Sequence, residues 1–292
     1  MVSGGTGFKM STAGATDYSV LESWIGQLSG LERPSAETQI FAVTQVANTG
    51  SVPFLGLAAD GNRYWVKYMG NAHGVDSLVA ERVVEALARK LSAPMRPSTL
   101  VDVPHSMTTD PRLLGTGIQA GVAHGSLLLE GSQEKTVLDW VGKDGNSARH
   151  PRFIALWELC FGEDGQWLYD RTHDDQMWSF DHGYWITGGE PAPLSLANLK
   201  VCVKTWRPWE GPVGGMDPSA FLDVAPELNA LAVADFIDVV ASVPIAWGVS
   251  DDVLEALAWW LHSRRRHAVA RMQVLAVAAA KSRPRSRTKG VK

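Results

Sequence analysis

Hydrophobic positions change their spacing several times along the chain, and each spacing predicts a different kind of element. In residues 18–31 apolar side chains recur every three to four positions, which is typical of an amphipathic helix, and Asp17 is suited to cap its start. In residues 40–69 β-branched and aromatic runs are separated by two turn-forming segments, which predicts a meander of three strands. The helical spacing returns in residues 76–91, and prolines end this helix before a further strand at STLVDVP.

The second half of the chain is predicted to be mainly helical. After a polar loop at residues 142–151, the segment PRFIALWELCF has the spacing of a helix. Two short aromatic strands, QWLYD and MWSFD, follow it. From Asp217 onward the apolar pattern is that of helices.

Together these elements predict an α+β fold with two lobes. Residues 38–120 are expected to form a small β-rich lobe, a β-meander with one helix, and residues 121–280 a larger, mainly helical lobe. Residues 1–37 are expected to form an N-terminal extension, and residues 281–292 a disordered basic tail. A cleft between such lobes is a common place for a ligand.

Composition excludes several classes of protein. With 292 residues, 45% of them hydrophobic and 20% charged, the chain is neither a disulfide-stapled mini-protein, nor a collagen-like fibre, nor wholly disordered. Cys160 and Cys202 fit no metal-binding or redox spacing, so we expect a reducing, cytoplasmic compartment. The longest candidate membrane span has 12 residues between Asp238 and Asp251, too few to cross a bilayer, and no membrane partner is expected.

Charge is distributed unevenly along the chain. The last twelve residues carry six positive charges and no negative ones, and since the whole chain carries −4, the other 280 residues carry −10. Such a tail is most simply a solubilising end, and the alternative is weak contact with nucleic acid or another acidic partner. Because the body is acidic, we do not expect a dedicated nucleic-acid-binding protein.

Lys67 is the first residue whose position suggests chemistry. It lies in the apolar strand YWVKYM, where burying an ammonium without an anionic partner is costly. Glu81, on the following helix, is a candidate partner, and a lysine held by a glutamate can clamp the phosphates of a nucleotide. The alternative, equally supported by spacing alone, is an edge-strand lysine with its head in water.

Three further positions could contribute to a phosphate or metal site. The turn NTGSVP contains Gly50 and Ser51, whose small size would let backbone N–H groups approach phosphate oxygens, although most such turns only connect strands. Asp181 ends an aromatic strand, where it could hold Mg²⁺. Asp164, between a helix and a strand, is a candidate base for a substrate hydroxyl. For each aspartate the alternative is a turn residue that caps its own backbone.

A cluster of acidic residues and histidines offers a competing interpretation, a metal-dependent hydrolase. No HxxxH or HxH spacing supports it, and residues 173–175 have the pattern of an exposed hairpin tip. We therefore prefer solvated turn residues for that tip. The cluster consists of Asp170, His173, Asp174, Asp175, Asp181 and His182.

The order of these features resembles that of the HipA-like kinases, distant relatives of protein kinases and phosphoinositide kinases. Five stretches carry the resemblance, in order between about residue 40 and residue 272. They are SVPFLGLAADGNRYWVKYMGNAHG, LVAERVVEALARKLSAP, GIQAGVAHGS, MWSFDHGYW, and ASVPIAWG with ALAWWLHSRRRHAV. The resemblance implies a two-lobed protein-kinase-like fold, with ATP and Mg²⁺ as cofactors.

The resemblance also implies roles for individual residues. Lys67 resembles the lysine that binds ATP phosphates, and Glu81 its helix partner. Gly50 and Ser51 resemble the phosphate-covering loop, and Ser51 could itself be phosphorylated. Asp181, in FDHG, is similar to the metal-binding aspartate of the family. Residues 124–129 correspond to the hinge that would hold the adenine.

The catalytic loop departs from the family pattern, which is close to G-N-x-D-R followed by an Asn. Here the segment is GEDGQ: Glu163 replaces the Asn, the Arg is missing and the loop is shorter. Asp164 is the candidate base, and Gln166 falls near the second metal-ligand position, with Asp170 as the alternative. The expected function is transfer of the γ-phosphoryl group to a hydroxyl, by family analogy that of a protein Ser or Thr. The alternative is a pseudokinase that binds nucleotide or a partner protein.

Overall fold

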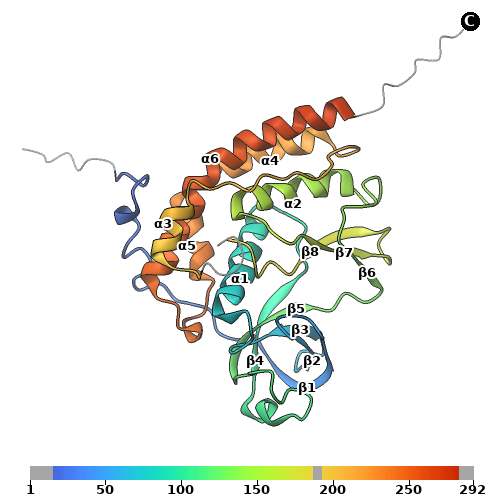
Figure 1. Ribbon diagram of the computed structural model, residues 1–292, viewed down its shortest axis with the longest axis vertical. Coiled ribbons are helices and arrows are strands. Elements are labelled where there is room, and N and C mark those ends of the chain that lie inside the picture. Colours follow the sequence, from blue (N-terminus) through green and yellow to red (C-terminus); the bar gives the residue numbers. More distant parts are fainter. Residues whose placement is uncertain (1–15, 187–192, 283–292) are drawn as a thin grey trace, which may run out of the picture.

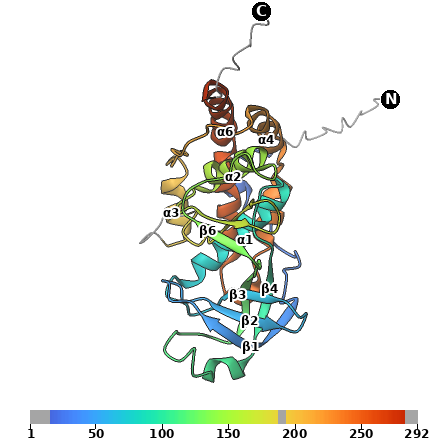
Figure 2. The same ribbon diagram turned by 90° about the vertical axis from the view of Figure 1, so that its right-hand side faces the viewer.

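The computed structural model describes residues 16–186 and 193–282, which form two lobes stacked along the long axis of the molecule (Figures 1 and 2). The small lobe is β-rich and the large lobe is mainly helical, so the predicted α+β architecture is confirmed. The predicted basic tail from residue 283 and the first 15 residues lie outside the described part.

The small lobe is built on a closed barrel in the order β1–β2–β3–β5–β4. The pairs are antiparallel except for β1 and β4, which are parallel. Alternating side chains point inward and form a core of their own, which includes Ile40, Phe54, Val66 and Val101. The strands are β1 (Thr38–Val46), β2 (Phe54–Ala58), β3 (Arg63–Lys67), β4 (Ser98–Val103) and β5 (Gly121–Leu127).

The predicted three-strand meander is therefore confirmed, but the predicted lobe boundary needs a correction. Strand β5, which closes the barrel between β3 and β4, lies beyond residue 120, in the range predicted for the helical lobe. Its sequence, GVAHGSL, is rich in small residues, which hides the strand pattern. One of these, Gly125, is required by packing, because a Cβ there would lie 2.7 Å from Val101 Cγ1.

Helix α1 (Gly74–Lys90) connects the two lobes. Its apolar residues face the core of the large lobe, where Leu78, Val79 and Val83 are fully buried. The same helix carries Glu81 toward the barrel. Helix and barrel thus share one wall, which places Glu81 beside β3.

The large lobe packs helices around a small antiparallel sheet in the order β6–β7–β8. Its longest helix, α6, has 32 residues and packs against four other helices of the lobe, α2, α3, α4 and α5 (Figure 1). The elements are β6 (Ser132–Lys135), α2 (Asn146–Cys160), β7 (Gln166–Asp170), β8 (Gln176–Phe180), α3 (Leu196–Cys202), α4 (Pro218–Ala230), α5 (Val233–Ala241) and α6 (Asp251–Ser282), with short 3-10 turns at Leu21–Ser23, His105–Thr109 and Ile245–Trp247.

Arg264, on α6, is the polar centre of the large lobe. Its side chain is fully buried, and its guanidinium donates to the carbonyl oxygens of Leu159 and Thr205. It also stacks on aromatic rings, 4.3 Å from that of Trp260 and 4.5 Å from that of Trp206. One side chain therefore fixes the end of α2 and the segment after α3 onto α6.

The predicted helix at residues 18–31 is wrong. The segment forms a single 3-10 turn, Leu21–Ser23, followed by further turns, because Gly26 and Gly30 adopt left-handed backbone angles of 88° and 77°. Its N–H groups are satisfied from elsewhere: Glu255 on α6 accepts hydrogen bonds from the N–H groups of Gly26 at 2.8 Å and Leu28 at 2.7 Å. Leu21, Trp24 and Leu28 are buried, but in turns instead of a helix, whereas Val20, Ile25 and Leu31 are exposed.

The polar loop predicted at residues 142–151 is also partly wrong, since α2 already begins at Asn146. Asn146 is fully buried: its side-chain NH₂ group donates to the carbonyl oxygen of Asp175 at 2.7 Å, and its side-chain oxygen accepts from the N–H of Met177 at 2.9 Å. A tertiary contact thus anchors the polar first turn of the helix. Strand β6 and helix α3 were not predicted at all.

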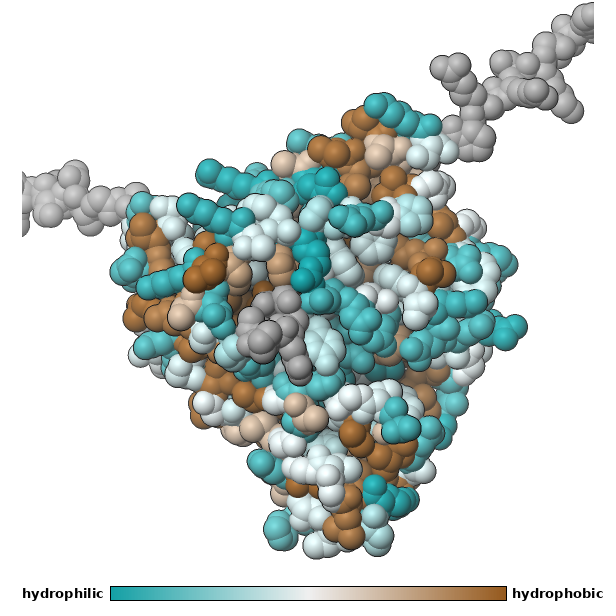
Figure 3. Space-filling model, viewed as in Figure 1, coloured by the Kyte–Doolittle hydropathy of each residue, from teal (hydrophilic) through white to brown (hydrophobic). Residues whose placement is uncertain are grey.

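On the face seen in Figure 3, apolar side chains form separate patches between polar ones. In the described ranges 16–186 and 193–282, no helix has both the length and the apolar character needed to span a membrane.

Candidate functional site

A cavity of about 240 Å³ lies between the barrel and the β6–β7–β8 sheet. Both lobes contribute to its wall, as the lobe arrangement predicted. The lining residues from the small lobe are Ala47, Thr49, Pro53, Trp65, Lys67, Glu81, Arg96 and Ser126, and those beyond β5 are Leu128, Leu129, Ser132, Glu134, Gln166, Leu168, Phe180 and Asp181.

Lys67 is the centre of charge in this cavity. Strand alternation turns Trp65 and Lys67 to the same side, where Lys67 is 8% exposed. Its ammonium forms ion pairs with two carboxylates, that of Glu81 on α1 and that of Asp181 after β8, the latter with a distance of 2.5 Å from Nζ to Oδ1. The predicted Lys67–Glu81 pair is therefore present, and the alternative of an edge lysine in water is wrong.

The two carboxylates keep the ammonium charged. Burial acts to lower the pKa of Lys67, but the charges of Glu81 and Asp181 outweigh it and raise that pKa above its ordinary value. Burial likewise acts to raise the pKa of Glu81, but the Lys67 charge and a hydrogen bond from His182 hold it well below its ordinary value. His124 stands behind the pair, and burial lowers its pKa to about 4, so its ring is neutral at neutral pH.

Asp181 reaches Lys67 because of the backbone that follows β8. Asp181 has a left-handed φ of 58°, which bends the chain out of the strand and toward α1. Gly183, two residues later, passes so close that a Cβ there would lie 3.1 Å from the Cβ of Ser77 and 3.6 Å from Lys67 Nζ. The sequence FDHG thus carries a carboxylate from one lobe onto the lysine of the other.

Asp164 and Gln166 lie next to each other at the start of β7. Gln166 lines the cavity, and its side-chain NH₂ group donates to Asp164 Oδ2 at 3.0 Å. Asp164 itself is exposed and has a left-handed φ of 47°. Glu163 forms an ion pair with Arg207. The structure therefore brings Gln166 and Asp181 to one cavity and leaves Asp164 at its edge.

The hairpin tip lies away from the cavity. Asp170 pairs with Gln176 at the far end of β7, four residues and about 13 Å along the strand from Gln166. It accepts hydrogen bonds from Thr172 and contacts His173 Nδ1 at 2.7 Å, so it is a turn residue and not the alternative metal ligand. Residues 16–186 and 193–282 contain no group of three or more His, Cys, Asp or Glu that could hold a metal ion, which leaves the hydrolase interpretation without a site.

The turn between β1 and β2 borders the cavity through Thr49 and Pro53. Gly50 and Ser51 are not among the lining residues, and Ser51 is buried. Gly50 packs against His73, where a Cβ would lie 2.6 Å from Nε2. The predicted phosphate-covering role of Gly50 and Ser51 stays a prediction, and the structure places the turn as a whole at the cavity mouth.

Two charged residues of the cavity were missed by the sequence analysis, Arg96 and Glu134. Arg96 precedes β4, and its backbone N–H donates to the carbonyl of Ser179 on β8 at 3.0 Å. Glu134 belongs to the unpredicted strand β6. Local patterns give no signal for either residue, because both reach the site through pairing between strands distant in sequence.

Comparison with known proteins agrees with this architecture. A family model described as HipA-like kinase matches residues 40–140, which include Lys67 and Glu81. No curated protein sequence matches the chain significantly. The resemblance to HipA-like kinases expected from the sequence is thus confirmed for the small lobe and the start of the large one.

Solved structures extend the likeness to both lobes. The crystal structure of the Helicobacter pylori proinflammatory kinase CtkA is similar at a TM-score of 0.55 and 11% identity, covering 84% of this chain and 98% of that one. A Golgi casein kinase structure with Mn/ADP bound has a TM-score of 0.44 and 11% identity, covering 90% of this chain and 77% of that one. The likeness to CtkA over 84% of this chain confirms the two-lobed kinase-like fold.

Proposed function

We propose that this protein is a nucleotide-dependent phosphotransferase that uses ATP and Mg²⁺. The observation that carries the proposal is the position of Lys67, buried between Glu81 and Asp181 in a cavity between two lobes. In kinases a strand lysine held by a helix glutamate binds nucleotide phosphates, and an aspartate after a later strand holds the metal. The HipA-like match over residues 40–140 supports this assignment.

The residues present suit a magnesium ion that is shared with phosphates. Mg²⁺ is usually held by one or two protein oxygens together with phosphate oxygens, and Asp181 and Gln166 offer a carboxylate and an amide oxygen on the same cavity. When bound, the ion neutralises charge on the phosphates. Lys67 would bind phosphate oxygens, and Glu81 would hold its ammonium in position.

Asp164 is the residue we assign to the acceptor hydroxyl. It lies at the cavity edge beside Gln166, and its carboxylate is exposed to an incoming substrate. By analogy with the HipA-like kinases, the acceptor is a Ser or Thr of a protein. Ser51 is a poorer acceptor in this conformation, because it is 4% exposed.

A second candidate function is nucleotide binding without transfer. It is favoured by the loop at residues 162–166, where Glu163 is paired with Arg207 and the Asp164 carboxylate is bound by Gln166. Neither arrangement impairs the Lys67–Glu81 pair. Nucleotide binding would therefore survive even if the loop were inactive.

Incubation with labelled ATP and Mg²⁺ tests the first function. We expect the wild-type protein to incorporate phosphate into itself or an added protein. Asp181→Ala should lower the rate by about 100-fold, because the carboxylate that would hold Mg²⁺ beside the transferred phosphoryl group is lost. Asp174→Ala, on the exposed hairpin tip of the same sheet, is the matched control and should retain the wild-type rate. Equal incorporation by wild type and Asp181→Ala would refute the assignment.

Asp164→Asn separates the two candidate functions. If Asp164 orients the acceptor, the variant should lose about 100-fold in transfer rate while ADP still raises its melting temperature as in the wild type. If wild type is stabilised by ADP but neither protein transfers phosphate, nucleotide binding alone is the function. Transfer at the wild-type rate by Asp164→Asn would remove Asp164 from the catalytic machinery.

A further inference from the structure

Arg96 brings a positive charge into the cavity without a direct hydrogen bond or ion pair to any described residue. Its side chain is buried, with 8% of the residue exposed, and its guanidinium lies 4.9 Å above the ring of Phe180. Within residues 16–186 and 193–282, no hydrogen-bond or ion-pair partner of this guanidinium is found, and Nε is buried without one. The other cation of the cavity, Lys67, is paired with Glu81 and Asp181.

An unpaired buried guanidinium is costly unless a ligand completes it. Burial lowers the pKa of Arg96 to about 10, although the charges of Glu81, Asp181 and Glu134 act in the opposite direction. Arg96 is therefore still charged at neutral pH. Its five N–H donors form a planar fork that suits a ligand with adjacent acceptor atoms.

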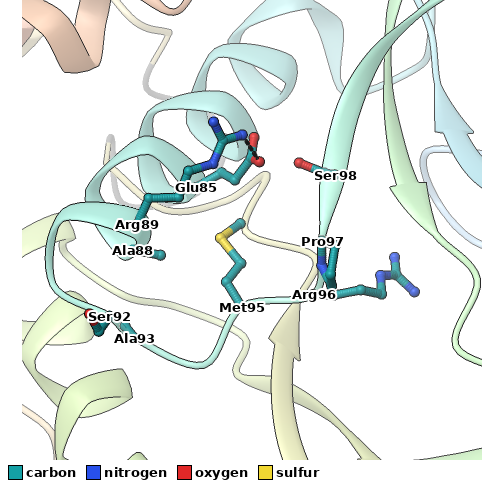
Figure 4. Close-up of a pocket in the computed structure, with 9 residues that line it drawn as sticks. All are labelled: Glu85, Ala88, Arg89, Ser92, Ala93, Met95, Arg96, Pro97 and Ser98. Atoms are coloured by element: carbon teal, nitrogen blue, oxygen red, sulfur yellow. Dashed lines mark hydrogen bonds and ion pairs between the residues drawn. The ribbon is translucent and has the colours of Figure 1, made fainter. Parts of the chain in front are cut away.

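Arg96 also separates two cavities. A second cavity of about 320 Å³ lies between the end of α1 and the start of β4 (Figure 4). Met95 points into this space, whereas the guanidinium of Arg96 extends away from Glu85 and Arg89. The charged end of Arg96 thus belongs to the cavity that contains Lys67.

Strand register places the backbone of Arg96 at the end of the cleft away from the backbone of Lys67, and its side chain extends from there over Phe180. Lys67 pairs with His124 on β5, whereas Ser98 pairs with Ser126, and the N–H of Leu127 donates to the carbonyl of Pro97 at 2.8 Å. The backbone of Arg96 therefore lies level with the connection after β5, about four residues and 13 Å along the strand from the level of Lys67. With phosphates on Lys67, this end of the cavity would receive the nucleobase.

We propose that Arg96 recognises the purine base and makes guanine nucleotides ligands of this cleft beside adenine nucleotides. Guanine presents two adjacent acceptors, O6 and N7, to which an arginine fork donates two hydrogen bonds. Adenine presents N7 beside an amino group, so it can accept only one. Glu134, an acceptor in the same cavity, complements the N–H donors of guanine. This inference rests on the proposed nucleotide site.

Equilibrium binding of Mg²⁺·GDP and Mg²⁺·ADP to the full chain tests the assignment. The wild type should bind GDP at least as tightly as ADP. Arg96→Met should lower the affinity for GDP by roughly 10- to 100-fold, since a bidentate arginine–guanine contact is lost, and the affinity for ADP by several-fold less. Arg96→Lys keeps the charge but not the fork, and should likewise lose the preference for GDP while remaining folded.

Arg149→Met is the matched control. The guanidinium of Arg149 lies 4.8 Å above the ring of Trp178, which is two residues before Phe180 on β8. Arg149 does not line the cavity. Its loss should leave the ratio of GDP to ADP affinity unchanged. A melting curve of each variant shows that it is folded.

Three results would overturn the proposal. Wild-type binding of GDP tenfold weaker than ADP would exclude guanine recognition. Equal losses for both nucleotides in Arg96→Met would place Arg96 on the phosphates instead of the base. If the wild type bound neither nucleotide, the proposed nucleotide-dependent function would be refuted as well. Either of the first two results would refute only the role of Arg96.

Discussion

Replacing Lys67 with Met is expected to lower the rate of phosphoryl transfer by about 10²–10³-fold, the cost of losing one preorganised charge that stabilises the transferring group. Met has nearly the length of Lys and no charge, so the shape of the cavity is preserved. The measurement is kcat/KM for ATP with labelled phosphate, compared with the melting temperature of the same protein. Wild-type kcat/KM in a folded Lys67→Met variant would contradict the proposed role.

The same substitution should also reduce stability, because Glu81 is buried and Lys67 supplies most of its compensating charge. Removing one partner of a buried pair costs about 3–5 kcal/mol of unfolding free energy. In wild type the pKa of Glu81 is depressed, so its contribution is present above the ordinary pKa and is lost as the pH falls below it.

In the variant the unpaired carboxylate has a raised pKa, and protonation stabilises the folded state. The difference in unfolding free energy between the wild type and Lys67→Met should therefore become smaller as the pH falls from 7 toward 5.

A double variant separates the two effects of Lys67. Lys67→Met with Glu81→Gln removes both buried charges and leaves only the carboxylate of Asp181, which is 34% exposed, without its partner, so the double variant should recover much of the stability lost in the single variant. It should not recover phosphoryl transfer. Recovery of both would mean that Lys67 acts only by neutralising Glu81.

Replacing Arg264 with Met should cost about 3–5 kcal/mol of unfolding free energy, since two or more buried carbonyl groups would lose their donor. Arg264 bonds the carbonyls of Leu159 and Thr205 while packed on Trp206 and Trp260. Burial lowers its pKa to about 10, so it is charged at neutral pH. Chemical denaturation of the full chain measures the effect.

Arg266→Met is the control for that experiment. Arg266 lies two residues away on the same helix and is exposed, so its loss should change stability by less than about 0.5 kcal/mol. Similar losses for both variants would show that the buried hydrogen bonds of Arg264 add nothing beyond helix propensity. Since neither residue touches the cavity, folded fractions of both should bind nucleotide as the wild type does.

Elements defined by local pattern could be predicted from the sequence. The meander, α1 and the aromatic hairpin each have strict alternation or a helical period, and their positions in the structure agree with the prediction. The Lys67–Glu81 pair could also be anticipated, because both residues lie on such elements and an ammonium in an apolar strand needs an anion.

Features that depend on distant contacts could not be predicted in this way. The apolar spacing of residues 18–31 is helical, but two glycines and an acceptor on α6 fix turns instead. Strand β5 is concealed by small residues that only packing explains. Arg96 and Glu134 enter the cavity through strand register, which no single segment encodes.

The attachment of residues 26–28 to Glu255 has a consequence for the order of folding during synthesis. These partners are separated by 229 and 227 positions, so the N-terminal segment emerges from the ribosome long before its acceptor exists. The barrel, whose strands all lie within residues 38–127, can close earlier from contacts of shorter range. We therefore expect the large lobe to be completed last, after α6 has been synthesised, because residues 26–28 cannot form their hydrogen bonds to Glu255 before then.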